Sequence, residues 1–141
     1  MEIRPLTDDY AVSPQITPDD IAAIAEAGYV TVVCNRPDGE VPQDVQAEAI
    51  RKAAEAAGLR FVLNPVTGGA ITLDNVTAQS KAIADSEGPV LAYCASGNRS
   101  SIVWALSQAG KQPTDSLIAI PARFGYGLEP FRATIDALAK N

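Results

Sequence analysis

The sequence predicts an α/β fold built around a mainly parallel sheet. Short apolar stretches alternate with helix-like stretches, and Gly or Pro separates most of them from the next. This alternation is typical of βα units, in which each helix returns the chain so that the next strand runs parallel to the last. The chain has 141 residues, 47% of them hydrophobic, and no linker-like segment. We therefore expect one domain over residues 1–141 with its own core.

The N-terminal half predicts two helix–strand units. The first helix has strong boundary signals, because Thr17 and Pro18 suit a helix start and Gly28 suits a helix end. The second helix is Ala-rich, and its apolar residues recur on one face. These units comprise a helix at 17–28, a strand at 29–34, a helix at 42–58 and a strand at 59–63.

The C-terminal half predicts one more strand among four helices. The apolar run "PVLAYC" at 89–94 is the strand, and Trp104 in the helix that follows is expected in the core. Pro121 is expected to bend the next helix. The predicted helices are 73–88, 99–110, 113–125 and 129–141.

Composition excludes several classes of function. The formal charge of −6 and the lack of a Lys/Arg cluster argue against nucleic-acid or anionic-membrane partners. Neither a signal-like N-terminus nor a run of about 18 apolar residues is present, so we expect a cytoplasmic protein without a membrane partner. Histidine is absent, which removes Ser-His-Asp and Cys-His catalysis and His-ligated metals. We expect no metal and no organic cofactor.

The segment "CASGNRS", residues 94–100, is the candidate site. It follows a predicted strand and opens a helix, which is where open α/β sheets bind ligands. Cys94 is the candidate nucleophile, because a helix N-terminus and a nearby arginine favour a thiolate. Arg99 would clamp an oxyanion with its planar fork. Ser100 would donate a hydrogen bond to the sulfur, or else satisfy a backbone group in the first helical turn. The substrate anion would lie on the amides of Ala95, Ser96, Gly97 and Asn98.

The loop is similar to the active-site loops of rhodanese-type sulfurtransferases and, with one residue more, of cysteine-dependent protein tyrosine phosphatases. Taken in order, residues 13–40, 64–72 and 88–110 resemble the small bacterial family called the β-lactamase-hydrolase-like protein phosphatase-like domain, also labelled a sulfur transferase family. The resemblance implies a dual-specificity-phosphatase-like fold, with a mainly parallel sheet of four to five strands flanked by helices. Family members also occur fused to a hydrolase of sulfide metabolism, which implies such a hydrolase as a partner in trans.

Two details favour sulfur transfer, with a persulfide on Cys94 and a small anionic or sulfane-sulfur substrate. Only four residues separate Cys94 from Arg99, as in a rhodanese loop. The loop after the strand predicted at 59–63, where phosphatase relatives carry their acid, reads "PVTGGAIT" and holds no carboxylate. Loss of a general acid lowers the rate of a reaction with a poor leaving group by about 100- to 10,000-fold. The alternative is a phosphatase acting through a phosphocysteine, with Asp38 or Asp74 as substitute acid. A non-catalytic oxyanion-binding or redox-sensing module is a second alternative.

Three other features remain open at this point. Cys34 ends the strand predicted at 29–34, which in the fold that the resemblance implies lies next to the strand that delivers Cys94. Cys34 is therefore either a redox or resolving partner or a buried, inert thiol. "NRPDGE", with Arg36, Asp38 and Glu40, is either a simple turn or a rim of the pocket. Phe124 and Tyr126 in "RFGYG" either line the pocket or close a helix.

Overall fold

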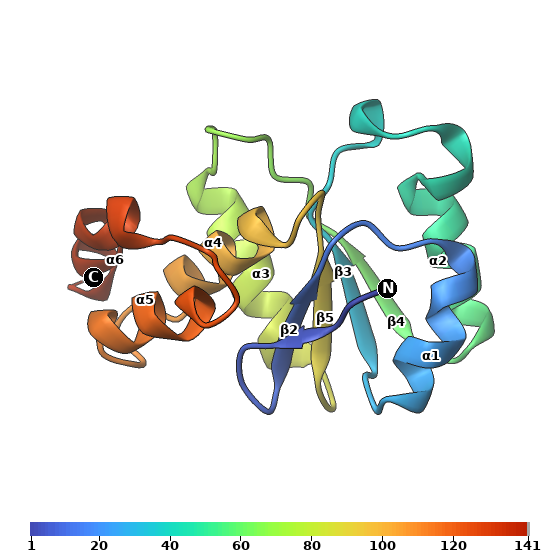
Figure 1. The fold of residues 1–141 in the computed structure, drawn as a ribbon, viewed down its shortest axis with the longest axis horizontal. Coiled ribbons are helices and arrows are strands. Elements are labelled where there is room, and N and C mark those ends of the chain that lie inside the picture. Colours follow the sequence, from blue (N-terminus) through green and yellow to red (C-terminus); the bar gives the residue numbers. More distant parts are fainter. Residues whose placement is uncertain (141) are drawn as a thin grey trace.

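The computed structural model describes residues 1–140 and contains one five-stranded sheet (Figure 1). The strands lie in the order β1-β2-β5-β3-β4, and only the β1–β2 pair is antiparallel. Because β5 lies at the centre, the loop that follows it emerges between the ends of two neighbouring strands. The strands are β1 (Arg4–Pro5), β2 (Tyr10–Ser13), β3 (Thr31–Cys34), β4 (Arg60–Leu63) and β5 (Val90–Tyr93).

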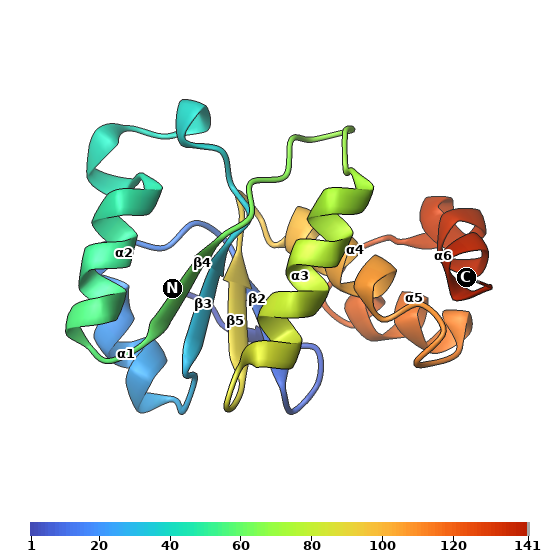
Figure 2. The same ribbon diagram turned by 180° about the vertical axis from the view of Figure 1, so that it is seen from behind.

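Helices cover both faces of the sheet, as the opposite views of Figures 1 and 2 show. On one face lie α1 (Ile21–Glu26) and α2 (Ala47–Ala56). On the other lie α3 (Leu73–Asp85) and α4 (Asn98–Ser107), with α5 (Thr114–Ala122) and α6 (Arg132–Ala139) packed outside α4. Single 3-10 turns occur at Pro18–Asp20, Asp38–Glu40, Gln43–Val45 and Glu129–Phe131.

Alternate residues of each strand divide the core into two halves. Val33 of β3 and Ala92 of β5 face the α3–α4 side, whereas Val32 and Leu91 face the α1–α2 side. Strands that are buried on both faces read as continuous apolar runs, which explains why β3 and β5 were recognisable in the sequence. Helix α4 is buried from Ser100 to Ser107, because it lies between the sheet and the α5–α6 layer. The Trp104 ring stacks on Tyr10 with centroids 6.0 Å apart.

The structure confirms the α/β fold class and the three predicted strands and six helices, with ends that shift by a few residues. Strands β1 and β2 were not predicted from the sequence. Strand β2 is only four residues long and wholly buried, and it pairs with β5, 80 residues away in the chain. Within residues 1–140, no helix is both long enough and apolar enough to cross a bilayer.

Candidate active site

The loop between β5 and α4 places Cys94 and Arg99 at the carboxyl edge of the sheet. Gly97 precedes α4 and has a φ of 97°, a left-handed conformation that glycine adopts without steric cost. This turn brings the backbone back over Cys94 and lets the helix begin at Asn98. The predicted strand–loop–helix arrangement is therefore present, and the positive end of α4 points at the loop.

The Cys94 sulfur is buried beneath the loop and accepts a hydrogen bond from the Gly97 amide. The Gly97 N to Cys94 Sγ distance is 3.1 Å, and Cys94 is 1% exposed. An amide N–H directed at sulfur stabilises a thiolate more than a thiol, because a hydrogen bond to a charged acceptor is the stronger one. The loop thus supplies one hydrogen-bond donor of the kind that a cysteine nucleophile needs.

The Arg99 guanidinium is held by two partners on other loops. Its Nη1 donates to Glu40 Oε2 at 2.9 Å and to the Val66 carbonyl at 2.8 Å, and its Nη2 donates to Glu40 Oε1 at 2.8 Å. A guanidinium has five N–H donors. Among the hydrogen bonds to residues 1–140, none uses the Nε–H or the second Nη2–H. These two donors share one edge of the guanidinium. That edge is the two-pronged fork that suits a tetrahedral oxyanion.

The Arg99–Glu40 contact also sets the charges of the site. Hydrogen bonds from Arg99 are the main cause that lowers the pKa of Glu40, and Arg36 contributes through its own contact of 3.2 Å. In turn, Glu40 is the main cause that raises the pKa of Arg99, and attraction to Cys94 adds to it. Glu40 is therefore an ionised carboxylate at neutral pH, suited to orienting Arg99 and unsuited to donating a proton.

Ser100 does not direct its hydroxyl at the sulfur. The hydroxyl donates to Asn35 Oδ1 at 2.9 Å, and this contact belongs to a buried polar network that also holds Asn64, Gln79 and Tyr10. The expected hydrogen bond from Ser100 to the sulfur is therefore wrong. A fully buried hydroxyl needs a hydrogen-bond partner, and the fold places the Asn35 side chain beside this one. The network ties β3, β4, α3 and α4 together below the loop.

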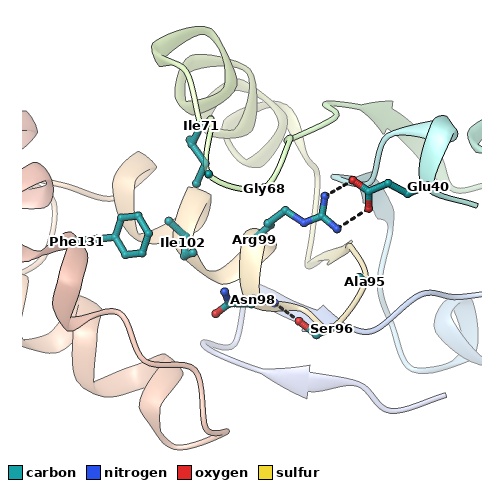
Figure 3. Close-up of a pocket in the computed structure, with 10 residues that line it drawn as sticks. Glu40, Gly68, Ile71, Ala95, Ser96, Asn98, Arg99, Ile102 and Phe131 are labelled. Carbon is teal, nitrogen blue, oxygen red and sulfur yellow. Dashed lines mark hydrogen bonds and ion pairs between the residues drawn. The ribbon is translucent and has the colours of Figure 1, made fainter.

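A pocket of about 510 Å³ opens beside Arg99 (Figure 3). One side is polar and carries the Glu40–Arg99 pair, and the other side is apolar. Of the residues predicted to bind substrate, Ala95, Ser96 and Asn98 line this pocket, whereas Gly97 is buried against Cys94. The remaining lining residues are Gly68, Gly69, Ile71, Ile102 and Phe131.

The two candidate acids lie outside the pocket lining. Asp38 Oδ1 accepts a hydrogen bond of 2.8 Å from the Ala47 amide at the start of α2, and Asp74 is exposed in the first turn of α3. The carboxylate that does line the pocket is Glu40, from the segment predicted to be either a simple turn or a rim of the pocket. Its role could not be read from the sequence, because its partner Arg99 lies 59 residues away.

Cys34 and Cys94 are both free thiols in this structure. Cys34 pairs in register with Tyr93 rather than with Cys94, and its side chain belongs to the core half on the α1–α2 side. Its thiol donates to the Arg36 carbonyl at 3.3 Å, and burial is the main cause that raises its pKa. These features match the inert alternative for Cys34, and its redox pairing with Cys94 stays a prediction.

The fold and this loop define a class of protein: α/β phosphatase-like domains with a cysteine–arginine loop. Residues 2–111 match the family described as Beta-lactamase hydrolase-like protein, phosphatase-like domain, and the chain belongs to that family. This confirms the resemblance found in the sequence.

Individual relatives agree with this assignment. The chain is 35% identical over 130 residues to the beta-lactamase hydrolase-like protein of Xylella fastidiosa. The aligned residues make up 91% of this chain and 30% of that protein. The chain thus spans less than a third of the length of this curated relative. A Neisseria meningitidis protein whose crystal structure is described as a candidate phosphatase shares 36% identity, with a TM-score of 0.83 over 98% of this chain and 99% of that one. Tk-PTP in its active form aligns with a TM-score of 0.76 at 16% identity over 99% of this chain and 97% of that one, which shows the common fold.

Proposed function

We propose that this protein is a phosphomonoester hydrolase that works through a phosphocysteine on Cys94. The observation that carries the proposal is a single loop that holds the Cys94 sulfur on the Gly97 N–H and presents Arg99 to the adjoining pocket. The family and its phosphatase-like relatives support this alternative over the sulfur transfer that the loop length favoured.

The reaction follows from the residues present. The Cys94 thiolate attacks phosphorus and forms the S–P bond, while the bond to the leaving oxygen breaks and the alcohol departs as an alkoxide. Arg99 and the loop amides stabilise the charge on the three remaining oxygens. Water then attacks the phosphocysteine, the S–P bond breaks, and inorganic phosphate and the thiolate are released.

The pocket favours a substrate whose leaving group needs little protonation. Among residues 1–140, the carboxylate that lines the pocket is Glu40. Hydrogen bonds from Arg99 and Arg36 keep it ionised. The wall formed by Ile71, Ile102 and Phe131 suits an aryl group, and aryl oxides depart without a strong acid. We therefore infer that aryl phosphates are hydrolysed faster than alkyl phosphates.

Sulfur transfer is the second candidate. It is supported by the four-residue spacing between Cys94 and Arg99 and by a chemistry that needs no proton donor. In this reaction the Cys94 thiolate attacks the sulfane sulfur of an anionic donor such as thiosulfate, sulfite leaves, and a persulfide forms on Cys94. A thiol or cyanide then attacks the outer sulfur, the S–S bond breaks, and the Cys94 thiolate is released. A sulfide-metabolism hydrolase acting in trans would be a partner for this role.

The experiment compares both reactions on one preparation of the wild-type protein and its Cys94→Ser variant. An aryl phosphate and an alkyl phosphate test hydrolysis, and thiosulfate with cyanide tests sulfur transfer. Phosphate release that requires Cys94 and prefers the aryl substrate supports the proposal. Cys94-dependent thiocyanate without phosphate would favour sulfur transfer over phosphate hydrolysis. If neither product forms, the remaining alternative is an oxyanion-binding or redox-sensing module.

A further inference from the structure

Two residues from opposite ends of the chain hold the outer side of the active-site loop. The Tyr126 hydroxyl donates to the Ser96 carbonyl at 2.7 Å. Arg4 Nη1 donates to the Tyr126 hydroxyl oxygen at 2.5 Å, and the Arg4 guanidinium lies over the Tyr126 ring, 5.7 Å from its centroid. Neither residue lines the pocket, and the reaction derived above assigns no step to either of them.

The Ser96 carbonyl and the Gly97 amide belong to the same peptide unit. Its oxygen points outward to Tyr126, and its N–H points inward to the Cys94 sulfur at 3.1 Å. A trans peptide is planar, so its C=O and N–H point in opposite directions and cannot rotate independently. A bond that fixes the carbonyl on the outside therefore fixes the amide hydrogen on the sulfur.

Local sequence explains how Tyr126 reaches the loop. Helix α5 ends at a glycine turn in which Gly125 has a φ of 88°, and the Tyr126 amide bonds back to the Pro121 carbonyl at 3.2 Å. This Schellman-type ending turns the chain, and Tyr126 becomes 94% buried. Its hydroxyl then lies so close to Gly97 that a Cβ added there would meet it at 2.3 Å. Tyr126 does close a helix, as one of the sequence alternatives held, and it also packs on the loop.

We propose that Tyr126, assisted by Arg4, is a positioning residue that holds the Ser96–Gly97 peptide with its N–H on the Cys94 sulfur and so favours the thiolate. The donation from Arg4 polarises the phenol, which strengthens the bond that the phenol gives to Ser96. Arg4 is itself held by Glu2, through a contact of 3.1 Å. The inference rests on the proposed role of Cys94 as nucleophile, but not on which substrate Cys94 attacks.

The test is the pKa of the Cys94 thiol, measured from thiolate absorbance near 240 nm as a function of pH. Each protein is compared with its own Cys94→Ser derivative, so that Cys34 and the tyrosines cancel. We expect Tyr126→Phe to raise the Cys94 pKa by about 1 unit. The Ser96 carbonyl then keeps only a longer contact of 3.4 Å with Arg4 Nη1, so the hydrogen bond from the Gly97 amide to the charged sulfur is weakened. Tyr29→Phe is the matched control, since Tyr29 lies before β3, away from the loop, and it should leave that pKa unchanged.

A second variant protects the test against a folding defect. Arg4→Met leaves the phenol in place and removes its donor, so it should raise the Cys94 pKa by a smaller amount than Tyr126→Phe. An unchanged Cys94 pKa in folded Tyr126→Phe would overturn the inference, as would an equal rise in Tyr29→Phe. If Tyr126→Phe does not fold, an unchanged pKa in Arg4→Met decides against it. The titration needs no substrate, so its outcome is independent of whether the protein hydrolyses phosphate.

Discussion

Replacing Gly97 with alanine is expected to damage the active-site loop in two ways. The first is backbone strain, because a side chain at a φ of 97° costs about 1–2 kcal/mol. The second is a collision, because the new Cβ would lie 2.3 Å from the Tyr126 hydroxyl oxygen and 3.0 Å from its ring carbon Cζ. Overpacking of this kind typically costs about 1–3 kcal/mol. We expect a total destabilisation of about 2–5 kcal/mol, which in a chain of this size lowers the Tm by on the order of 10 °C.

Thermal unfolding followed by circular dichroism measures this effect. Gly39→Ala is the matched control, since no atom lies within 4 Å of a Cβ added there and its φ is not positive. Its Tm should stay close to that of the wild type. Combining Gly97→Ala with Tyr126→Phe should recover part of the collision cost but none of the strain, which a double-mutant cycle resolves. A Tm for Gly97→Ala equal to that of the control would refute the reasoning.

Four further predictions concern residues around the loop. Glu40→Gln should lower kcat/KM by about 10-fold, the cost of one charge-assisted bond that orients Arg99. Because the pKa of Glu40 is lowered in the folded protein, its ion pair stabilises the fold at neutral pH and is lost as pH falls below about 5. Acid unfolding should therefore be less steep in Glu40→Gln than in the wild type. Asp38→Asn should keep kcat/KM for aryl phosphates within a few-fold, and a loss above about 100-fold would restore Asp38 as the acid. Mass spectrometry after mild peroxide tests the redox pair: a Cys34–Cys94 disulfide shows as the loss of two hydrogen atoms, and its absence would rule out redox pairing of the two cysteines.

The nucleophilic loop could be predicted from the sequence because its signals are local. A buried strand, a glycine with positive φ and a helix start all occur within residues 89–100, so position alone placed Cys94 and Arg99 at the edge of the sheet. The strong helix boundaries at Pro18 and Gly28 are local in the same way.

The contacts that hold the loop were not predictable, because they join residues that are distant in the chain. Glu40 and Arg99 are separated by 59 residues in the sequence. Asn35 and Ser100 are 65 residues apart, and Ser96 and Tyr126 are 30 residues apart. A polar side chain in a turn has many potential partners before folding, and only tertiary packing selects one. Strand β2 was missed for a related reason, since four residues carry little periodic signal and their pairing with β5 is not local.

The most direct test of the central claim is to trap the covalent intermediate. The wild-type protein is mixed with an aryl phosphate, quenched in acid within milliseconds and digested for mass spectrometry, with Cys94→Ser treated identically. The account predicts a phosphoryl group on the peptide that carries Cys94, and none on the variant. An unmodified Cys94 after aryl phosphate, together with an added sulfur on Cys94 after thiosulfate, would contradict it.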